Sequence, residues 1–237
     1  MRTAALRSMR RQLISNQTIE PTQIVGFNQL FDDLNGAISK RYAGGVDQKI
    51  TDSFTVGGEA TSREISVPLF LGDQISNFDW KEKTERVYAY WWISGSKSKG
   101  RQYGDWASAL SVEYQRERFD RPVDDTGNEG IVRLDTRFVP LGFAIFPTLG
   151  LSFRITTTYV RQEGQLQVAP STDQIPISSR FWLTDVVAKY QLPNRHMSMA
   201  FGIANLFNVQ RNYIEIDPLN PRIAPGRFVF GNVRLQF

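Results

Sequence analysis

The chain offers very few side chains that could act as nucleophiles or metal ligands. Among its 237 residues it has no cysteine and a single histidine, His196. Without cysteine there is no thiol nucleophile, no thiolate metal site and no disulfide scaffold. One histidine is too few for a multi-histidine metal site, and a Ser-His-Asp triad would have to use His196 itself. Because His196 follows Pro193 and Asn194 in a short turn, we expect it to be an ordinary solvated residue.

Carboxylates are numerous but form no catalytic pattern in the sequence. Asp32 with Asp33, and Asp124 with Asp125, lie in segments rich in loop-forming residues. Whether two carboxylates reach the separation of a glycosidase pair depends on the fold. Glycine motifs that bind phosphate or dinucleotides are absent from the sequence. We therefore predict no catalytic residues, no metal and no cofactor, and a chain that is not an enzyme.

Apolar and polar residues alternate with a period of two along most of the chain, which is typical of β-strands. The clearest segments are 131–138, 151–159, 182–192, 197–204 and 229–237. Less regular segments lie at 2–13, 22–31, 38–50, 54–70, 87–93 and 106–115. Helical periodicity is weak between these segments, so the pattern predicts an all-β fold with about ten or eleven long antiparallel strands.

Short and long connections alternate between the predicted strands. We expect short turns at 50–53, 147–150 and 193–196, and longer loops at 71–81, 120–130, 164–178 and 210–227. Membrane β-barrels have short turns at one end and long loops at the other. No apolar stretch reaches the ~18 residues that a membrane helix needs. The sequence thus predicts a transmembrane β-barrel, with 1–21 as a basic segment that supplies a partial strand and 22–237 as the barrel strands.

Polar side chains that alternate with apolar ones would face the lumen of such a barrel. Charges of both signs occur on neighbouring strands and would form cross-strand ion pairs. These residues either hydrate and brace the wall, or also contact a plug or a passing solute. The lumen candidates are Glu113, Gln115, Arg133, Asp135, Arg137, Arg154, Asp185, Lys189 and Arg234.

Aromatic residues gather in the segment 80–92 and recur near residues 182–190. Because tryptophan and tyrosine favour the interfaces of a membrane, we expect them to form an aromatic girdle. In a soluble protein the same side chains would form a core or a sugar-binding platform. The girdle candidates are Trp80, Tyr88, Tyr90, Trp91, Trp92, Trp182 and Tyr190.

The chain ends on an aromatic residue preceded by apolar residues at alternate positions. These are Val229, Val233, Leu235 and Phe237. The pattern resembles the C-terminal assembly signal of bacterial outer-membrane barrels. Its physical basis is a last strand that faces lipid on one side and must pair at its edge.

Two further segments resemble TonB-dependent receptors. Residues 205–208 (NLFN), followed by 225–227 (PGR), are similar to the end of the penultimate strand and the entry to the last strand in that family. Residues 16–22 (NQTIEPT) are similar to a mid-barrel N-x-x-L-x-P-E stretch. Here Ile19 replaces the usual leucine and Thr22 the usual glutamate.

This resemblance implies an outer-membrane receptor that takes up a solute, with the chain covering the second half of a 22-strand barrel. It implies contact with outer-membrane lipid and lipopolysaccharide, and with the barrel-assembly machinery. Through a plug outside this chain it also implies an inner-membrane energy-coupling complex. Nucleic acid is not implied, and the net charge of +4 indicates only a mild preference for anions.

Two other classes of function stay open on the sequence alone. One is a passive porin-like channel, or an outer-membrane scaffold within a larger fused protein. The other is a soluble all-β binding module or hydrolase, which would bury its apolar face against a second layer instead of lipid.

Overall fold

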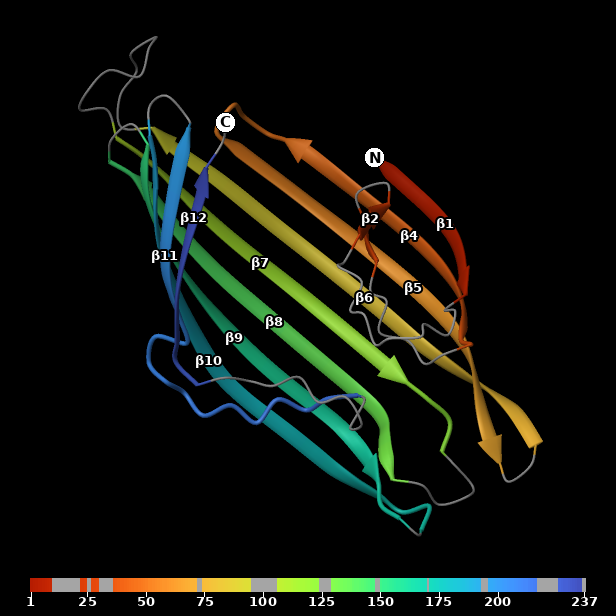
Figure 1. Ribbon diagram of the computed structural model, residues 1–237. Helices are drawn as coiled ribbons and strands as arrows, with labels where there is room; N and C mark the ends of the chain where they lie inside the picture. Colours follow the sequence, from red (N-terminus) through yellow and green to blue (C-terminus); the bar gives the residue numbers. More distant parts are fainter. Residues whose placement is uncertain are drawn as a thin grey trace.

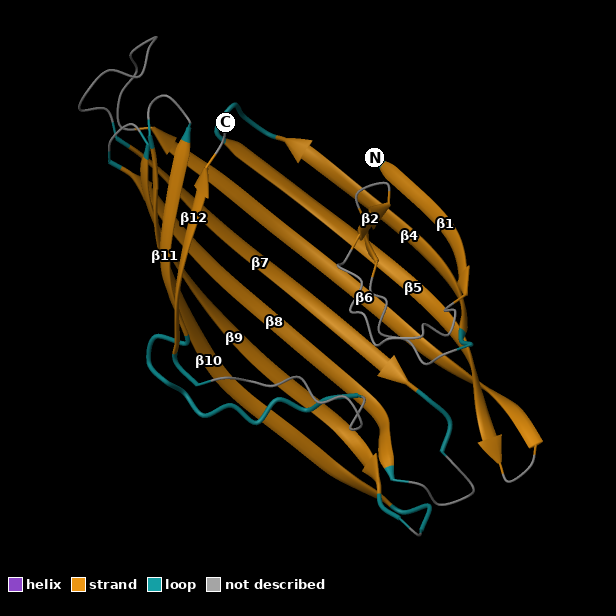
Figure 2. Cartoon of the chain, viewed as in Figure 1, coloured by secondary structure: helices purple, strands orange, loops and turns teal. Residues whose placement is uncertain are grey.

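The computed structural model describes residues 1–9, 22–24, 27–29, 36–71, 74–94, 106–123, 129–147, 150–169, 171–192, 196–216 and 226–235. In these ranges every regular element is a β-strand, as Figure 2 shows. The described residues contain no helix of the length and apolar character needed to cross a membrane. The prediction of an all-β, antiparallel fold is confirmed.

Ten strands form one antiparallel sheet, and two short strands form a separate hairpin. Figure 1 shows the ten strands side by side in one broad, curved sheet. In spatial order they are β1 (Arg2–Met9), β4 (Ile38–Lys49), β5 (Phe54–Leu71), β6 (Gln74–Ser94), β7 (Ala107–Asp120), β8 (Gly130–Phe146), β9 (Leu151–Gln167), β10 (Gln174–Gln191), β11 (Met197–Ala204) and β12 (Phe228–Leu235). The hairpin, β2 (Thr22–Ile24) and β3 (Phe27–Gln29), replaces the single strand predicted at 22–31.

The large sheet is open, with β1 and β12 at its two edges. β1 pairs with β4 from Arg2 opposite Gly45 to Met9 opposite Ile38. Residues 2–9 therefore belong to the same sheet as strands β4 to β12, although the sequence suggested a boundary at residue 21. The described strands do not close into a cylinder, so barrel closure stays a prediction.

The connections agree with the sequence at the short turns and differ at two long loops. Strands end and begin on either side of the turns predicted at 50–53, 147–150 and 193–196. The loop predicted at 71–81 is wrong, because only residues 72–73 separate β5 from β6. Pairing resumes at once, with Leu71 opposite Gln74 and Ile65 opposite Trp80. Asp79 and Lys81 thus belong to a strand in which they alternate with Trp80. The loop predicted at 164–178 is shorter than expected, because only residues 168–173 separate β9 from β10, and Gly164 pairs with Ile177.

The strand registers assign each strand residue to one of two faces, because opposed residues share a face and successive residues alternate. The segment 205–216, between β11 and β12, lies over one face and crosses in front of β8 to β10 in Figure 1. There the Gln162 side chain donates to the Ile214 carbonyl at 3.0 Å and accepts from its N–H at 2.8 Å. We call this side the covered face and the opposite side the uncovered face.

The buried core lies on the covered face, near the long loops. Phe119, Ile131 and Leu134 are 3 to 6% exposed and pack together, with Ile214 of the covering segment against them. A register irregularity between Ile131 and Arg133 turns Ile131 back toward this core. The covering segment therefore has an apolar attachment as well as its hydrogen bonds.

Candidate functional site

The nine lumen candidates lie on both faces of the sheet. Six share the covered face, namely Glu113, Gln115, Arg154, Asp185, Lys189 and Arg234. The other three, Arg133, Asp135 and Arg137, lie on the uncovered face, opposite to Leu134 on the same strand. A barrel has one inner face, so these three cannot line the same lumen as the other six.

The seven girdle candidates are divided in the same way. Trp80, Tyr88, Tyr90 and Trp92 lie on the covered face, and Trp91, Trp182 and Tyr190 on the uncovered face. The ring of Trp80 makes an edge-to-face contact with the core residue Phe119, and the two ring centroids are 5.5 Å apart. The seven residues therefore do not form one girdle.

On the covered face a network of ion pairs crosses five neighbouring strands. Arg2 on β1 lies 3.4 Å from the Asp47 carboxylate on β4 and 3.2 Å from Glu59 on β5. Arg86 on β6 lies 3.5 Å from Glu59 and 2.6 Å from Glu113 on β7. Two guanidinium groups and three carboxylates leave this network with one excess negative charge.

Two tyrosine hydroxyl groups complete the network. Tyr88 donates a hydrogen bond to Asp47, and Tyr90 donates to Glu113 at 2.7 Å. The Arg86 guanidinium also lies 4.9 Å from the centre of the Tyr88 ring, a cation–π distance. Each charged group thus has several partners, which gives a rigid polar wall. Within the described ranges no group of three or more His, Cys, Asp or Glu residues could hold a metal ion.

The turn that follows β11 is built by two asparagines of the NLFN segment. Asn205 and Asn208 have φ angles of 51° and 53°, in the left-handed region that asparagine tolerates. The Asn205 N–H donates to Asp185 at 2.8 Å, and its side chain exchanges hydrogen bonds of 3.0 and 2.8 Å with the Val209 backbone. Asn208 accepts from the Arg227 N–H at 2.8 Å. These bonds fix both ends of the connection between β11 and β12.

Replacement of Asn205 tests this turn. We expect Asn205→Ala to lower the free energy of unfolding by roughly 2–3 kcal/mol, because two side-chain hydrogen bonds are lost and alanine disfavours the left-handed conformation. Asn205→Gly loses the same hydrogen bonds but keeps the conformation, so it should cost less. Urea unfolding of the folded protein measures both. An equal loss for alanine and glycine would contradict the role of the backbone conformation.

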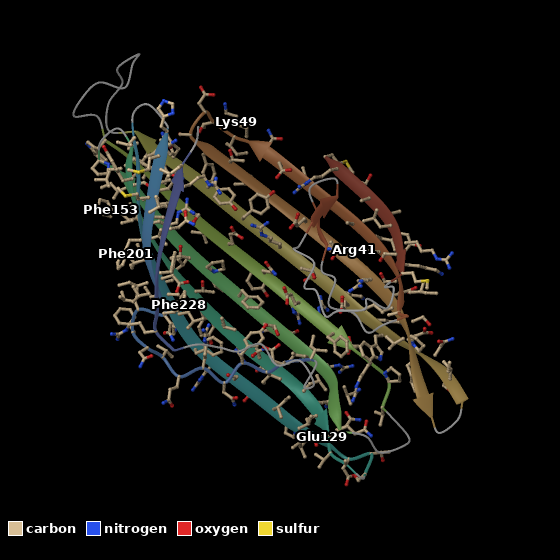
Figure 3. The ribbon with its side chains drawn as sticks, viewed as in Figure 1. Arg41, Lys49, Glu129, Phe153, Phe201 and Phe228 are labelled. Atoms are coloured by element: carbon tan, nitrogen blue, oxygen red, sulfur yellow. The ribbon has the colours of Figure 1, made fainter. Side chains whose placement is uncertain are left out.

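A continuous band of exposed apolar side chains occupies the uncovered face on the half of the sheet nearest the short turns. We define this apolar band as the uncovered-face residues from Leu151 to Tyr159 on β9, together with the residues that lie level with them on the neighbouring strands. The side chains of Trp182, Phe201 and Val233 are 52 to 62% exposed. Figure 3 shows side chains on both faces, with Phe153 and Phe201 of the band labelled. Further exposed members include Val87, Trp91, Leu110, Val112, Leu141, Phe143, Ile155, Met199 and Val229.

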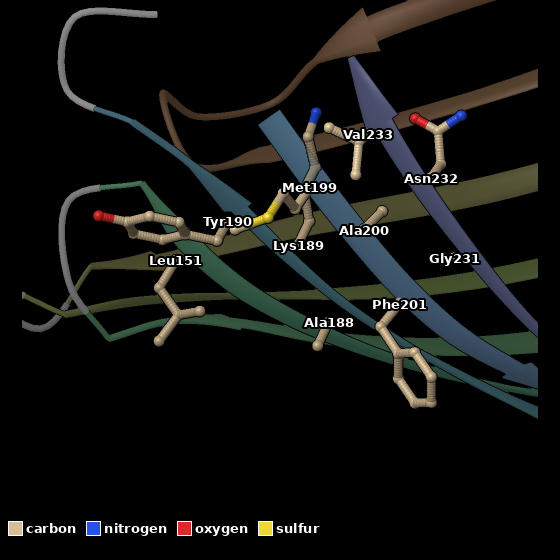
Figure 4. A pocket seen from close by; sticks show the side chains of 10 residues that line it. All are labelled: Leu151, Ala188, Lys189, Tyr190, Met199, Ala200, Phe201, Gly231, Asn232 and Val233. Carbon is tan, nitrogen blue, oxygen red and sulfur yellow. The ribbon is translucent and has the colours of Figure 1, made fainter. Parts of the chain in front are cut away.

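Three of the predicted assembly residues and a shallow hollow lie in this band or at its border toward the short turns. Val229, Val233 and Leu235 are exposed on the uncovered face, and Phe237 lies outside the described residues. The hollow has a volume of about 370 Å³ and is lined by Leu151, Tyr190, Met199 and Phe201, among others (Figure 4). The lining also includes Lys189 and Asn232, but most of its side chains are apolar, so the hollow suits apolar contact.

Beyond the apolar band, toward the long loops, the uncovered face becomes charged. Arg133 contacts Asp120 at 2.7 Å, and Asp135 contacts Arg137 at 3.1 Å. Asp135 also accepts a hydrogen bond of 2.8 Å from Arg116. Burial raises the pKa of the Asp135 carboxyl, but Arg116 and then Arg137 lower it by more, so its pKa lies below its ordinary value. Three of the predicted lumen residues are therefore members of ion pairs on the uncovered face.

The described part of the chain thus presents two faces of different chemistry. Sequence reasoning located Glu113, Tyr88 and Tyr90 but missed Arg2, Asp47, Glu59 and Arg86 as members of the network. Only the pairing of β1 with β4, across the intervening residues 10–37, brings Arg2 to it. Neither a family model, nor a curated protein, nor a solved structure matches this chain.

Proposed function

We propose that this chain forms part of the wall of a bacterial outer-membrane β-barrel receptor that takes up a solute. In this arrangement the uncovered face contacts lipid and the covered face borders the lumen. One observation carries the proposal, namely the segregation of the apolar band onto one face and of the ion-pair network onto the other. A soluble sheet would bury such a band under a second layer. Within the described ranges the band is left exposed.

The height of the apolar band supports this proposal. On β9 the band runs from Leu151 to Tyr159, which is nine residues, and a tilted membrane strand needs ~9–11 residues. Tyr159 and Trp182 are in contact at its border toward the long loops, with ring centroids 4.9 Å apart and planes tilted by 43°, and Tyr190 lies near the short turns. Aromatic residues at both borders are typical of membrane interfaces. Thr157 and Thr184 interrupt the band, but their hydroxyl groups lie 3.2 Å apart and hydrogen-bond to one another.

The covered face supports a receptor more than an open pore. The segment 205–216 lies over this face and would occupy part of a lumen. The ion-pair network supplies the polar surface that water or a polar solute requires. The resemblance of residues 205–208 and 225–227 to TonB-dependent receptors points to the same class. A passive porin-like channel is the second candidate, and steady ion conductance of the reconstituted protein would favour it.

The cysteine-free sequence permits a direct test of which face meets lipid. A nitroxide spin label attached to Val186→Cys lies on the uncovered face of β10, and one attached to Val187→Cys lies on the covered face. Each labelled variant is inserted into vesicles of phosphatidylcholine. We expect the label at 186 to collide with lipid-soluble oxygen and the label at 187 with a water-soluble nickel chelate. The same alternation should extend over residues 183–190. Equal access of the nickel chelate to both positions would contradict the proposal.

A further inference from the structure

Four arginines lie side by side on the uncovered face. Arg116 on β7 is opposite Arg137 on β8, Arg137 is opposite Arg161 on β9, and Arg161 is opposite Arg180 on β10. Opposed residues share a face, so the four side chains follow one another at the ~4.8 Å spacing of the strands. We call these four residues the arginine row.

The arginine row lies directly beside the apolar band. The next row on the same face, two positions along each strand toward the short turns, consists of Val139, Tyr159 and Trp182. These three residues are opposed to one another on β8, β9 and β10. Cationic and aromatic side chains therefore meet along one line across the sheet. Such a border is where the polar headgroups of a membrane begin.

The carboxylates near the row do not neutralise it. Asp135 contacts Arg116 and lies 3.1 Å from Arg137, and Glu163 contacts Arg161 and lies 4.0 Å from Arg137. These two carboxylates relieve the repulsion that directly opposed like charges create in a sheet. A third carboxylate, Glu85, lies opposite Arg116 but pairs with Arg118, so these two charges balance each other. The four guanidinium groups of the row against Asp135 and Glu163 then leave two excess positive charges.

Arg180 carries much of this excess charge. Its side chain is exposed, and it forms no ion pair with any residue in the described ranges. The remaining arginines of the row are partly exposed, at 28% for Arg116, 34% for Arg137 and 47% for Arg161. The row therefore presents an accessible surface for an anion and not a buried ion pair.

We propose that the arginine row binds the phosphate group of a phosphorylated membrane lipid whose acyl chains lie on the apolar band. This inference rests on the proposed placement of the uncovered face in a membrane. Guanidinium groups bind phosphate oxygens through paired, charge-assisted hydrogen bonds. A lipid carries its phosphate directly beside its acyl chains, and the row lies directly beside the band. The match of charge and of apolar surface therefore selects a lipid over a soluble anion.

The test measures lipid retained by the full chain after extraction from vesicles into mild detergent, by native mass spectrometry. The probes are phosphatidic acid and phosphatidylcholine with identical acyl chains. We expect wild type to retain phosphatidic acid preferentially. Arg180→Gln should lower its retention about fivefold, and a second change, Arg137→Gln, should lower it about fivefold again. Arg180→Lys keeps the charge and should retain most of the preference.

Arg154→Gln is the matched control. Arg154 is an exposed arginine on β9, next to β10, but it lies on the covered face. Its replacement removes the same charge and should leave retention of phosphatidic acid unchanged. A loss as large as that of Arg180→Gln would show a general charge effect and would overturn the site.

The other outcomes separate this proposal from the proposed function. Unchanged retention in Arg137→Gln/Arg180→Gln would overturn the lipid site, while the spin-label alternation on β10 would still support membrane placement. Absence of that alternation would overturn the membrane placement and the lipid site together. Displacement of the lipid by inorganic phosphate alone would show that the row binds free phosphate, which would also overturn the lipid site.

Discussion

Val186→Arg is expected to keep the protein out of the membrane, whereas Val187→Arg is not. Val186 lies on the uncovered face of β10, midway between Trp182 and Tyr190 at the two borders of the apolar band. An arginine facing lipid at the middle of a bilayer costs about 2–4 kcal/mol. Val187 lies on the covered face opposite Arg154. There an arginine meets only the repulsion of a like charge, which costs about 0.2–1 kcal/mol.

The comparison of these two neighbours is informative because the side chain that is introduced is the same. The fraction of protein that inserts into phosphatidylcholine vesicles can be measured from the heat-modifiable band on a gel. We expect a much smaller inserted fraction for Val186→Arg than for Val187→Arg. A larger defect at position 187 would show that the covered face meets lipid, which contradicts the proposed orientation.

Gly150→Val is expected to destabilise the fold by roughly 2–5 kcal/mol. Gly150 ends the short turn between β8 and β9 with a φ of +85°, which a β-branched residue adopts only under strain. A Cβ atom at this position would also overlap the carbonyl oxygen of Gln191. The backbone cannot easily move away, because the Gly150 carbonyl accepts a hydrogen bond of 2.7 Å from the Gln191 N–H.

Gly44→Val provides the matched control for this substitution. Gly44 lies in β4, and a Cβ added there has no atom within 4 Å. Valine is favoured over glycine in a strand, so we expect unchanged or slightly higher stability. Urea unfolding midpoints of both variants measure the difference. If Gly150→Val unfolds at the same urea concentration as Gly44→Val, the strain and overlap at Gly150 are not present in the folded protein.

The alternation of residues was enough to predict the strands but not which face of each strand points inward. In the segment 131–138, Leu134 and Arg133 were correctly placed on opposite faces. The apolar set was then assigned to the outside, as in a strand wholly within lipid. In the structure Ile214, which is distant in the sequence, packs against the cluster that contains Leu134, so this apolar set lies on the covered face. A period of two carries no information about which distant segment will cover a face.

The error at 71–81 has a different physical cause. Gly72, Asp73 and Asn77 are residue types that favour loops, so the segment reads as one. In the structure, residues 72–73 are followed by β6, which begins at Gln74. Asn77 and Asp79 lie on the uncovered face beyond the apolar band, where polar side chains are favourable in a strand. Composition alone therefore confuses a solvated part of a long strand with a loop.

The arginine row was invisible in the sequence for a third reason. Its members are separated by about twenty residues each along the chain and belong to four strands. Arg137 could be assigned to a face of its own strand, but its neighbours depend on three strand registers. A shift of one residue in any register would move the opposing arginine to the other face. The site is therefore a property of pairing, and no local motif reports it.

The order of the strands also bears on how the sheet assembles. From β4 to β12, each strand pairs with the strand that follows it in the chain. The entropy lost on closing a loop grows with its length, and it is small for the two-residue link between β5 and β6. The entropy loss is larger for residues 10–37, which separate β1 from its partner β4, and for residues 205–227, which separate β11 from β12. The pairing of consecutive strands thus favours hairpins in the middle of the sheet as a nucleus, with both edge strands docking at the greatest entropic cost.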